Sequence, residues 1–288
     1  MAQQIPIDSD AIAESIDQGT VHEVLPDLAY QRLAIVNVVY YGGPGASEWV
    51  LIDAGVMGSA RAIRRAVAKR FGEAARPAAI VLTHGHFDHV GALEELADGW
   101  DVPVYAHVLE HPYLNGGASY PPPDPGVGGG MMARLSPLYP RGPVDVSDRL
   151  LELPRDGSLP AMPGWCWIHA PGHTPGQIAL WRESDRTLIA ADAFVTTAQE
   201  SAYAVALQKP EIHGPPMYYT QDFEAAAASV RALAALEPEL VVTGHGRAME
   251  GAEMRAALHA LARDFERVAV PEDGRYVRQP ARGEESYR

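Results

Sequence analysis

The chain has 288 residues, 47% of them hydrophobic, and a formal net charge of −14 at pH 7. A chain of this length and composition can bury a sizeable core. Its acidic charge disfavours a partner with a phosphate backbone, and we find no basic cluster that offsets it, so we expect no nucleic-acid partner.

The single cysteine, Cys166, lies between two tryptophans in a strand-like run. We predict a buried thiol there rather than a nucleophile or a metal ligand, and the chain holds no disulfide framework. The sequence shows neither a targeting signal nor an apolar run of roughly 18 residues. We therefore expect a cytoplasmic protein with no membrane partner.

Apolar periodicity predicts the elements in chain order. The first half gives strands over 21–41 and 48–52, a helix over 59–71, a strand over 79–82, a helix over 90–97 and a strand over 103–106. The second half gives strands over 150–153, 165–168, 178–181 and 188–191, a helix over 223–236, a strand over 240–242 and a helix over 252–268. This order fits the α/β class as an αββα sandwich, in which two mixed β-sheets pack face to face with helices outside.

The most informative motif is T-H-G-H-F-D-H at residues 83–89, directly after an apolar run. Imidazole and carboxylate groups suit zinc or a similar divalent ion, and an extended chain projects His84 and His86 to the same side. If a helix begins near Asp88, that carboxylate and His89 turn towards a neighbouring point. The motif therefore predicts ligands for one or two metal ions.

Three further candidate ligands follow apolar runs. His173 lies in the turn P-G-H-T-P-G, Asp192 ends the run T-L-I-A-A, and His245 lies in T-G-H-G after L-V-V. Turns at strand ends are where scaffolds mount functional side chains. A carboxylate at Asp192 can bridge two ions with its two oxygens.

With these residues the sequence resembles the metallo-β-lactamase fold superfamily, which includes glyoxalase II-like thioesterases, acyl-homoserine lactonases and zinc β-lactamases. The resemblance implies two metal sites, one held by three histidines and one by an aspartate and two histidines. By position, the first set is His84, His86 and His173, and the second is Asp88, His89 and His245. The resemblance also makes Asp192 the bridging ligand and Asp53 the acidic group that orients a ligand from behind.

The candidate ligands span residues 84–245 and must converge, so we predict one catalytic domain. The predicted organisation is an N-terminal extension over 1–20, a single domain over 21–270 with a loop insertion near 111–143, and a C-terminal tail over 271–288.

The resemblance implies a dinuclear metal-dependent hydrolase with two Zn²⁺ ions, or iron or manganese, and no other cofactor. A hydroxide shared by the two ions would attack the carbonyl of an ester, lactone, thioester or amide. Asp88 and Asp192 are the catalytic candidates, because Asp88 can carry a proton to the leaving group and Asp192 can hold the ions together.

Three alternatives stay open. Persulfide dioxygenases share the fold and motif but bind a single iron, here through His84, His173 and Asp192. A metal-stabilised binding protein without turnover would need a site closed to water, and the Gly- and Pro-rich loops argue for access instead. A dedicated β-lactamase is disfavoured, because zinc β-lactamases with this motif generally lack the aspartate at the position of Asp192.

The substrate is weakly constrained by the sequence. The lactonases often carry a tyrosine three residues after the bridging aspartate, where this chain has Val195, and the glyoxalase II-like enzymes need a basic cluster that is absent after His245. Two irregular stretches are expected to line the pocket, with the candidate residues Met131, Met132, Phe194, Tyr203, His213 and Tyr218. We expect a small-molecule substrate with an apolar moiety, and a homodimer is one oligomeric option.

Overall fold

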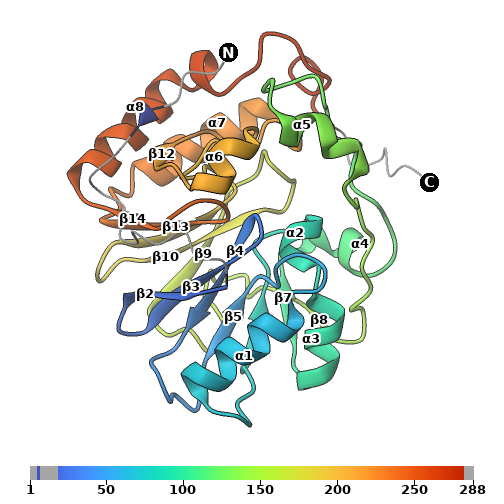
Figure 1. The fold of residues 1–288 in the computed structure, drawn as a ribbon, viewed down its shortest axis with the longest axis vertical. Coiled ribbons are helices and arrows are strands. Elements are labelled where there is room, and N and C mark those ends of the chain that lie inside the picture. The colour runs from blue at the N-terminus through green and yellow to red at the C-terminus, as the bar shows by residue number, and fades with distance from the viewer. Residues whose placement is uncertain (1–4, 7–18, 282–288) are drawn as a thin grey trace. The chain divides into compact units, whose positions relative to one another are not determined.

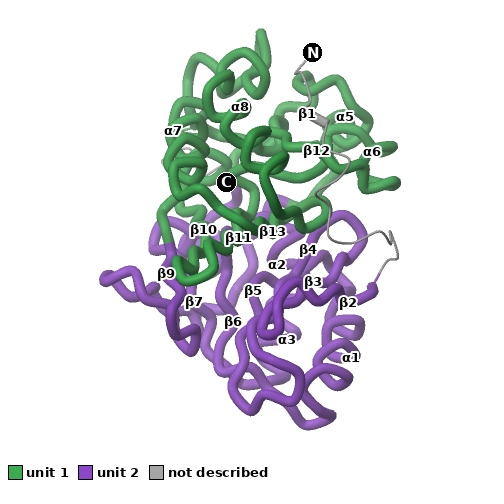
Figure 2. Tube along the Cα trace, turned by 90° about the vertical axis from the view of Figure 1, so that its left-hand side faces the viewer, with its two compact units in different colours: residues 1–16, 121–140, 168–287 green, residues 17–120, 141–167, 288 purple. Residues whose placement is uncertain are grey.

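The structure is a computed structural model that describes residues 5–6 and 19–281. The chain forms two compact units, which Figure 2 shows in different colours. Of the described residues, unit 2 comprises 19–120 and 141–167, and unit 1 comprises 5–6, 121–140 and 168–281. Most of the predicted N-terminal extension and the last part of the predicted tail, residues 282–288, lie outside the described residues.

Unit 2 is built on a seven-stranded mixed sheet with the order β2-β3-β4-β5-β6-β7-β8. Its strands are β2 (Val21–Leu25), β3 (Leu28–Leu33), β4 (Val36–Tyr41), β5 (Val50–Ile52), β6 (Ala79–Val81), β7 (Val104–Ala106) and β8 (Leu150–Glu152). The strands from β2 to β5 pair antiparallel, and those from β5 to β8 pair parallel. Parallel neighbours need a crossover connection, which α1 (Ala60–Phe71) and α3 (Leu93–Trp100) supply.

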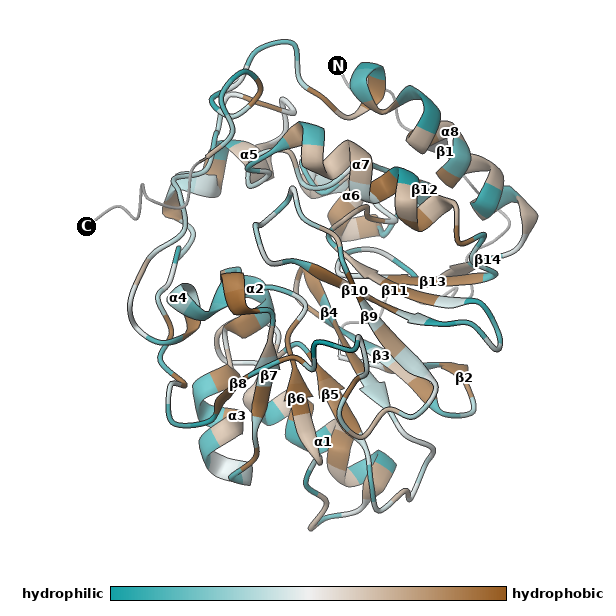
Figure 3. Ribbon diagram, turned by 180° about the vertical axis from the view of Figure 1, so that it is seen from behind, coloured by the Kyte–Doolittle hydropathy of each residue, from teal (hydrophilic) through white to brown (hydrophobic). Residues whose placement is uncertain are grey.

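The two crossover helices bury their apolar stripes against this sheet (Figure 1). Ile63 and Val67 of α1 are buried, as the helical spacing predicts. Trp49 stacks on Phe71 of α1 at 4.4 Å between ring centroids and meets Trp100 of α3 edge to face at 5.9 Å. Figure 3 shows the strands β5, β6 and β7 as mainly hydrophobic, as expected for strands that helices cover.

The predicted helix over 90–97 is wrong in its bounds. The chain forms a short helix α2 (Phe87–Val90), interrupts it at Ala92, and begins α3 at Leu93. The amide of Gly91 donates to the carbonyl of Gly55 at 2.7 Å, which fixes the interruption. Two short helical turns follow β7, namely η1 (Val108–Glu110) and α4 (His111–Leu114).

The outer face of α1 carries a basic stripe that the sequence analysis did not expect. Arg61, Arg65 and Lys69 are exposed and recur at helical spacing, and they line one shallow hollow. Glu73 and Glu95 line the same hollow, so its charge is mixed.

Unit 1 holds a five-stranded mixed sheet with the order β14-β13-β11-β10-β9. Its strands are β9 (Trp165–His169), in which the unit boundary falls, β10 (Ile178–Arg182), β11 (Thr187–Ala191), β13 (Leu240–Thr243) and β14 (Met249–Glu250). The helices α7 (Phe223–Ala234) and α8 (Ala252–Val268) lie side by side against it (Figure 1). The hydrophobic and hydrophilic bands of α8 in Figure 3 fit a helix with one buried face.

The inserted stretch and the C-terminal segment pack together within unit 1. The remaining elements here are α5 (Met131–Leu135), η2 (Ser136–Leu138), α6 (Ala202–Leu207), β12 (Glu211–Ile212) and β1 (Ile5–Pro6), which pairs with β12. The amide of Met132 donates to the carbonyl of Glu200 at 3.1 Å. The buried Tyr276 donates its hydroxyl proton to the carbonyl of Pro122 at 2.7 Å. The described part of the predicted tail is thus fixed to the insertion by a hydrogen bond.

These two mixed sheets with flanking helices confirm the predicted α/β architecture. Within the described part of the chain, we find no helix with the length and apolar content needed to cross a bilayer.

Candidate metal centre

Four candidate ligands lie together after strand β6 in unit 2. His86 has an extended backbone and is the N-cap of helix α2, so that Asp88 and His89 occupy the first turn of this helix. The imidazole of His84 lies 4.8 Å from that of His86 and 4.1 Å from that of His89, measured between ring centroids. All four side chains are buried. We call His84, His86, Asp88 and His89 the motif half-site.

Asp53 supports the motif half-site from the end of the neighbouring strand β5. Its backbone adopts the left-handed conformation with φ 61°, which is strained for a residue other than glycine. Its Oδ1 accepts the amide proton of Thr83 at 2.8 Å, and its Oδ2 lies 2.8 Å from Thr83 Oγ1 and 2.7 Å from His89 Nδ1. The carboxylate thus lies directly behind a candidate ligand.

These contacts assign the ring protons of two histidines. A carboxylate accepts only, so the Nδ1 proton of His89 is donated to Asp53. Thr83 donates its hydroxyl proton to Asp53, so the same hydroxyl oxygen accepts from His84 Nδ1 at 3.1 Å. Both imidazoles therefore keep the Nε2 lone pair, which is the form that binds a metal ion.

A close backbone approach holds α2 against the loop after β5. A Cβ at Gly91 would lie 2.1 Å from the backbone nitrogen of Met57, so only glycine fits. The amide of Ala54 donates to the carbonyl of His89 at 2.6 Å. The backbone that carries the last motif histidine is thereby fixed to the loop that carries Asp53.

Two residues that the sequence analysis missed lie beside the motif. The carboxylate of Glu110 and the phenol of Tyr120 both face the amide of Gly85. Burial, together with the negative charge of Glu110, raises the pKa of Tyr120 well above its ordinary value, so the phenol stays protonated. No motif in the sequence marks these two residues, because their place follows from the parallel pairing of β6 with β7, whose ends meet at one edge of the sheet.

Three candidate ligands lie together in unit 1. His173 follows β9, Asp192 follows β11 and His245 follows β13, and all three are buried. Oδ2 of Asp192 lies 3.4 Å from Nε2 of His173 and 3.0 Å from Nε2 of His245. One carboxylate oxygen thus faces two imidazole nitrogens. We call His173, Asp192 and His245 the strand-end half-site.

Hydroxyl groups support the strand-end half-site. Thr220 donates its hydroxyl proton to the carbonyl of Pro216 at 2.8 Å, so its oxygen accepts from Nδ1 of His173 at 3.2 Å. Nδ1 of His173 therefore carries the ring proton, and Nε2, which faces Asp192, carries the lone pair. The carbonyl of His245 accepts from the hydroxyls of Thr196 and Thr243 at 3.1 and 2.6 Å.

The turn that carries His173 also depends on a glycine. Gly172 has φ +132°, and a Cβ there would lie 2.2 Å from the backbone nitrogen of Ala226 in α7. Its carbonyl accepts from the amides of Gln221 and Asp222, both at 2.9 Å. The start of α7 therefore fixes this turn.

The predicted pocket residues occupy different environments within unit 1. Phe194, His213 and Tyr218 are buried, and Phe194 is 0% exposed. Met131 is 59% exposed, Tyr203 is 73% exposed and Met132 is half-buried. The structure therefore describes Phe194 as a core residue and Tyr203 as a surface residue.

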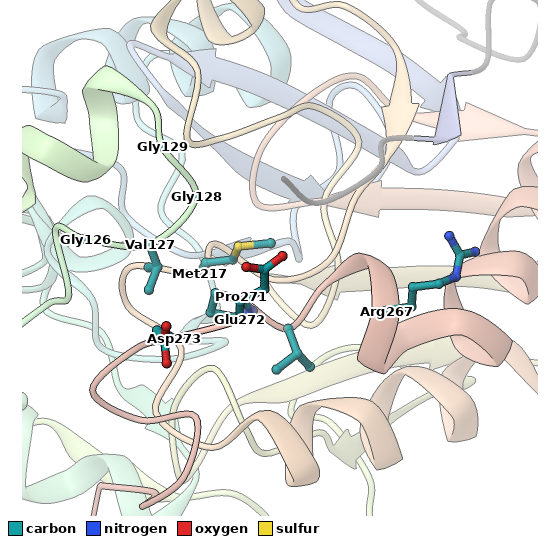
Figure 4. A pocket seen from close by; sticks show the side chains of 10 residues that line it. Gly126, Val127, Gly128, Gly129, Met217, Arg267, Pro271, Glu272 and Asp273 are labelled. Atoms are coloured by element: carbon teal, nitrogen blue, oxygen red, sulfur yellow. The ribbon is translucent and has the colours of Figure 1, made fainter.

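A cavity of about 330 Å³ in unit 1 adjoins the insertion and the C-terminal segment. It is lined by the glycine-rich residues 126–129, by Met217 and by residues 270–273. Figure 4 shows Val127, Met217 and Glu272 gathered around it, while Arg267 extends from α8 to one side. Its volume is in the range of small-molecule pockets.

The donor set of both half-sites fits divalent metal ions. All seven side chains are imidazoles or carboxylates, and all are buried. Of the buried histidines in the described part of the chain, His213 alone lies outside the two half-sites. Imidazole nitrogen with carboxylate oxygen suits zinc, iron or manganese, whereas a magnesium or calcium site would be built from oxygens.

Comparison with known proteins agrees with this donor set. Residues 32–245 match the sequence profile of the metallo-beta-lactamase superfamily. The chain is 47% identical over 249 residues to the probable metallo-hydrolase YflN of Bacillus subtilis, covering 86% of this chain and 94% of that protein. It is 29% identical over 170 residues to the probable metallo-hydrolase YybB of the same organism, covering 59% of this chain and 64% of that protein.

The chain is also similar to solved structures, whereas its family is shown by the profile match over residues 32–245 and by the similarity to YflN. The crystal structure of TTHA1623 in a di-iron-bound form is 25% identical with a TM-score of 0.51, over 81% of this chain and 93% of that one. A beta-lactamase domain protein from Burkholderia ambifaria is 19% identical with a TM-score of 0.60, over 89% of this chain and 79% of that one, which shows the fold alone. The chain therefore belongs to the metallo-beta-lactamase superfamily.

Proposed function

We propose that this protein is a dinuclear metal-dependent hydrolase that cleaves an ester, lactone, thioester or amide bond. The main support is the proton assignment within the half-sites, because Nδ1 of three histidines donates to a fixed oxygen and leaves Nε2 to bind metal. The similarity to probable metallo-hydrolases supports the reaction class.

The proposal joins the two half-sites in one centre. By the order of ligands in the superfamily, His84, His86 and His173 would hold the first ion, and Asp88, His89 and His245 the second. Asp192, whose Oδ2 faces two imidazoles, would be the shared ligand. Zinc is the proposed metal, and iron is the first alternative because a related structure contains two iron ions.

Such ions lower the pKa of a coordinated water and polarise a carbonyl group. Asp88 is the proposed proton carrier, since its carboxylate is the one acidic group of the motif half-site and belongs to α2 beside His89. Asp53 and Thr220 would hold His89 and His173 in the metal-binding tautomer.

We propose a small-molecule substrate with an apolar moiety, which the cavity of unit 1 would take. Val127, Met217, Val270 and Pro271 give this cavity apolar walls. Two acids, Glu272 and Asp273, line it against one base, Arg267, which disfavours an anionic group. The amide of Thr220 donates to the carbonyl of Met217 at 3.3 Å, so one short turn links the cavity wall to the residue behind His173. Cytoplasmic location, the lack of nucleic-acid and membrane partners, and homodimer formation stay predictions.

The alternative is a single-iron oxidoreductase related to persulfide dioxygenases, with His84, His173 and Asp192 as iron ligands. The related di-iron structure keeps iron in consideration. This alternative needs neither Asp88 nor His245 as a ligand. The β-lactamase structures among the similar folds share too little sequence to support β-lactam cleavage here.

The proposal is tested by assaying zinc-loaded protein against a panel of esters, lactones and thioesters, with and without a chelator. We expect hydrolysis that the chelator abolishes and that zinc restores. The variant His86→Ala should lose this activity, and His259→Ala should keep it, because His259 is an exposed histidine that pairs with Glu237 outside both half-sites. Hydrolysis that survives complete removal of metal would contradict the proposal.

A further inference from the structure

The sheet of unit 2 brings a buried acid next to the metal-binding motif. Strands β6 and β7 pair parallel, so their C-terminal ends lie at the same edge of the sheet. Beyond β6 the chain continues to His84, Gly85 and His86. Beyond β7 it enters η1, whose last residue is Glu110. Residues 25 apart in the sequence thereby become neighbours.

Glu110 and Tyr120 converge on one backbone amide. The N–H of Gly85 is 2.9 Å from Glu110 Oε2 and 2.9 Å from the hydroxyl oxygen of Tyr120. The Tyr120 hydroxyl donates its proton to the same carboxylate oxygen. A Cβ at Gly85 would lie 2.7 Å from this hydroxyl, so the position has no room for a side chain.

Burying the Glu110 carboxylate costs free energy of folding, which indicates that this acid has a role at the motif. Glu110 is 0% exposed and Tyr120 is 1% exposed. A buried carboxylate destabilises a protein unless hydrogen bonds replace its water, and here Gly85 and Tyr120 both donate. An apolar side chain could fill the same space without that cost, but it could not hold the amide between the first two motif histidines.

The ring of Tyr120 extends the same support to His86. It meets the His86 imidazole edge to face, with ring centroids 4.5 Å apart. The same ring stacks on Tyr113, with centroids 3.8 Å apart and planes at 17°. Tyr120 is thus fixed by Tyr113 while it touches both the backbone and a side chain of the motif.

We propose that Glu110 and Tyr120 are positioning residues, which hold the Gly85 peptide and the His86 ring in the geometry that binds metal. The inference rests on the proposed function and adds two residues to its site. The feature that matters is the acceptor at Glu110 Oε2, because both donors meet at this atom. An amide oxygen can replace it, and a methyl group cannot.

The test compares zinc affinity, by chelator competition, with hydrogen exchange of the Gly85 amide measured without metal. For Glu110→Ala we expect zinc affinity to fall about 10–100-fold and the Gly85 amide to exchange faster. Tyr120→Phe should lower the affinity by about tenfold or less, because Glu110 still accepts from Gly85. Glu110→Gln should restore most of the affinity. Tyr105→Phe on β7 is the matched control and should bind zinc as the parent protein does.

Each outcome bears on a separate claim. Parent-like affinity and parent-like Gly85 exchange in both Glu110→Ala and Tyr120→Phe would overturn the positioning role. Equal losses in Glu110→Gln and Glu110→Ala would also overturn it, since charge rather than position would then be the cause. A parent protein that binds no zinc would contradict the proposed function, while the exchange of Gly85 would still test the hydrogen bonds. If Glu110→Ala fails to fold, Tyr120→Phe and Glu110→Gln carry the comparison.

Discussion

The two half-sites are assembled from the sequence in opposite ways. The motif half-site takes four side chains from six consecutive residues, so its ligands are near each other whatever the rest of the fold does. The strand-end half-site collects one residue after each of three strands, between residues 173 and 245. Its geometry therefore depends on the pairing of β11 with β13 and on the turns that follow the strands.

The support behind the two half-sites also differs. Behind the motif half-site lie two carboxylates, Asp53 and Glu110, which accept from the ligand histidine or from the motif backbone. Behind the strand-end half-site lie neutral hydroxyls, among them Thr220 and Thr243. The contiguous motif is thus supported by acids that lie far from it in the sequence. Ligands at strand ends are fixed largely by the sheet.

The largest effect is expected for Asp192→Ala, because the proposal makes this carboxylate the only ligand shared by both ions. We expect metal binding to weaken and kcat/KM to fall about 10³-fold or more, as loss of several kcal/mol of transition-state stabilisation implies. Steady-state kinetics on zinc-loaded protein measure this. Near-parent activity would show that the strand-end half-site is not part of the centre.

The acidic support is tested by Asp53→Asn. Oδ1 of Asp53 accepts from the Thr83 amide, and Oδ2 accepts from the Thr83 hydroxyl and from His89, whereas an amide cannot accept at both of its terminal atoms. We expect zinc affinity to fall about 10–100-fold by chelator competition. Asp148→Asn, at an exposed aspartate of the same unit, should leave the affinity unchanged. An unchanged affinity in Asp53→Asn would remove the distinction between acidic and hydroxyl support.

The neutral support is tested by Thr220→Val, which keeps the shape and removes the hydroxyl. The Nδ1 proton of His173 then loses its acceptor, and we expect zinc affinity to fall by about tenfold or less. Thr220→Ser should restore it. A loss larger than that of Asp53→Asn would reverse the ranking of the two half-sites.

The cavity in unit 1 that Val127 lines is the proposed site for the apolar part of the substrate. The variant Val127→Trp should fill it. If the cavity takes the apolar part of the substrate, KM should rise several-fold for long-chain esters while short-chain esters keep their kcat/KM. Val108→Trp, at a half-exposed valine in unit 2, is the matched control. Equal effects on short and long chains would place the apolar group elsewhere.

The smallest effect concerns a buried acid outside both half-sites. Burial raises the pKa of Glu211 above its ordinary value of 4.5, while His213 and Lys209 oppose this shift. The folded state therefore holds the Glu211 proton more tightly than the unfolded state, and the parent protein loses stability as the pH rises above 4.5. In denaturant titrations at pH 8, the free energy of unfolding of Glu211→Gln should exceed that of the parent by about 1 kcal/mol. Near pH 4.5 the two proteins should have the same free energy of unfolding. A gain at pH 4.5 as large as at pH 8 would contradict this cause.

The sequence predicted the longer strands because apolar runs mark buried strands, and it missed the two-residue strands β12 and β14. It misplaced the helix after the motif, because the break at Ala92 depends on a hydrogen bond from Gly91 to a loop 36 residues earlier, at Gly55. Donor types and order predicted the candidate ligands. Glu110, Tyr120 and Thr220 were not predicted, since each contacts a residue of the motif or of the strand-end half-site that is 25 to 47 positions away. Only the pairing of strands and the packing of turns reveal such contacts.

The central claim is that the two half-sites together bind two metal ions. We would measure metal content by mass spectrometry for the parent protein and for His86→Ala and His245→Ala, purified without added metal. The account predicts about two zinc or similar divalent ions per chain in the parent and fewer in each variant. A single iron per parent chain, retained in full by His245→Ala, would contradict the dinuclear hydrolase and favour the single-iron alternative.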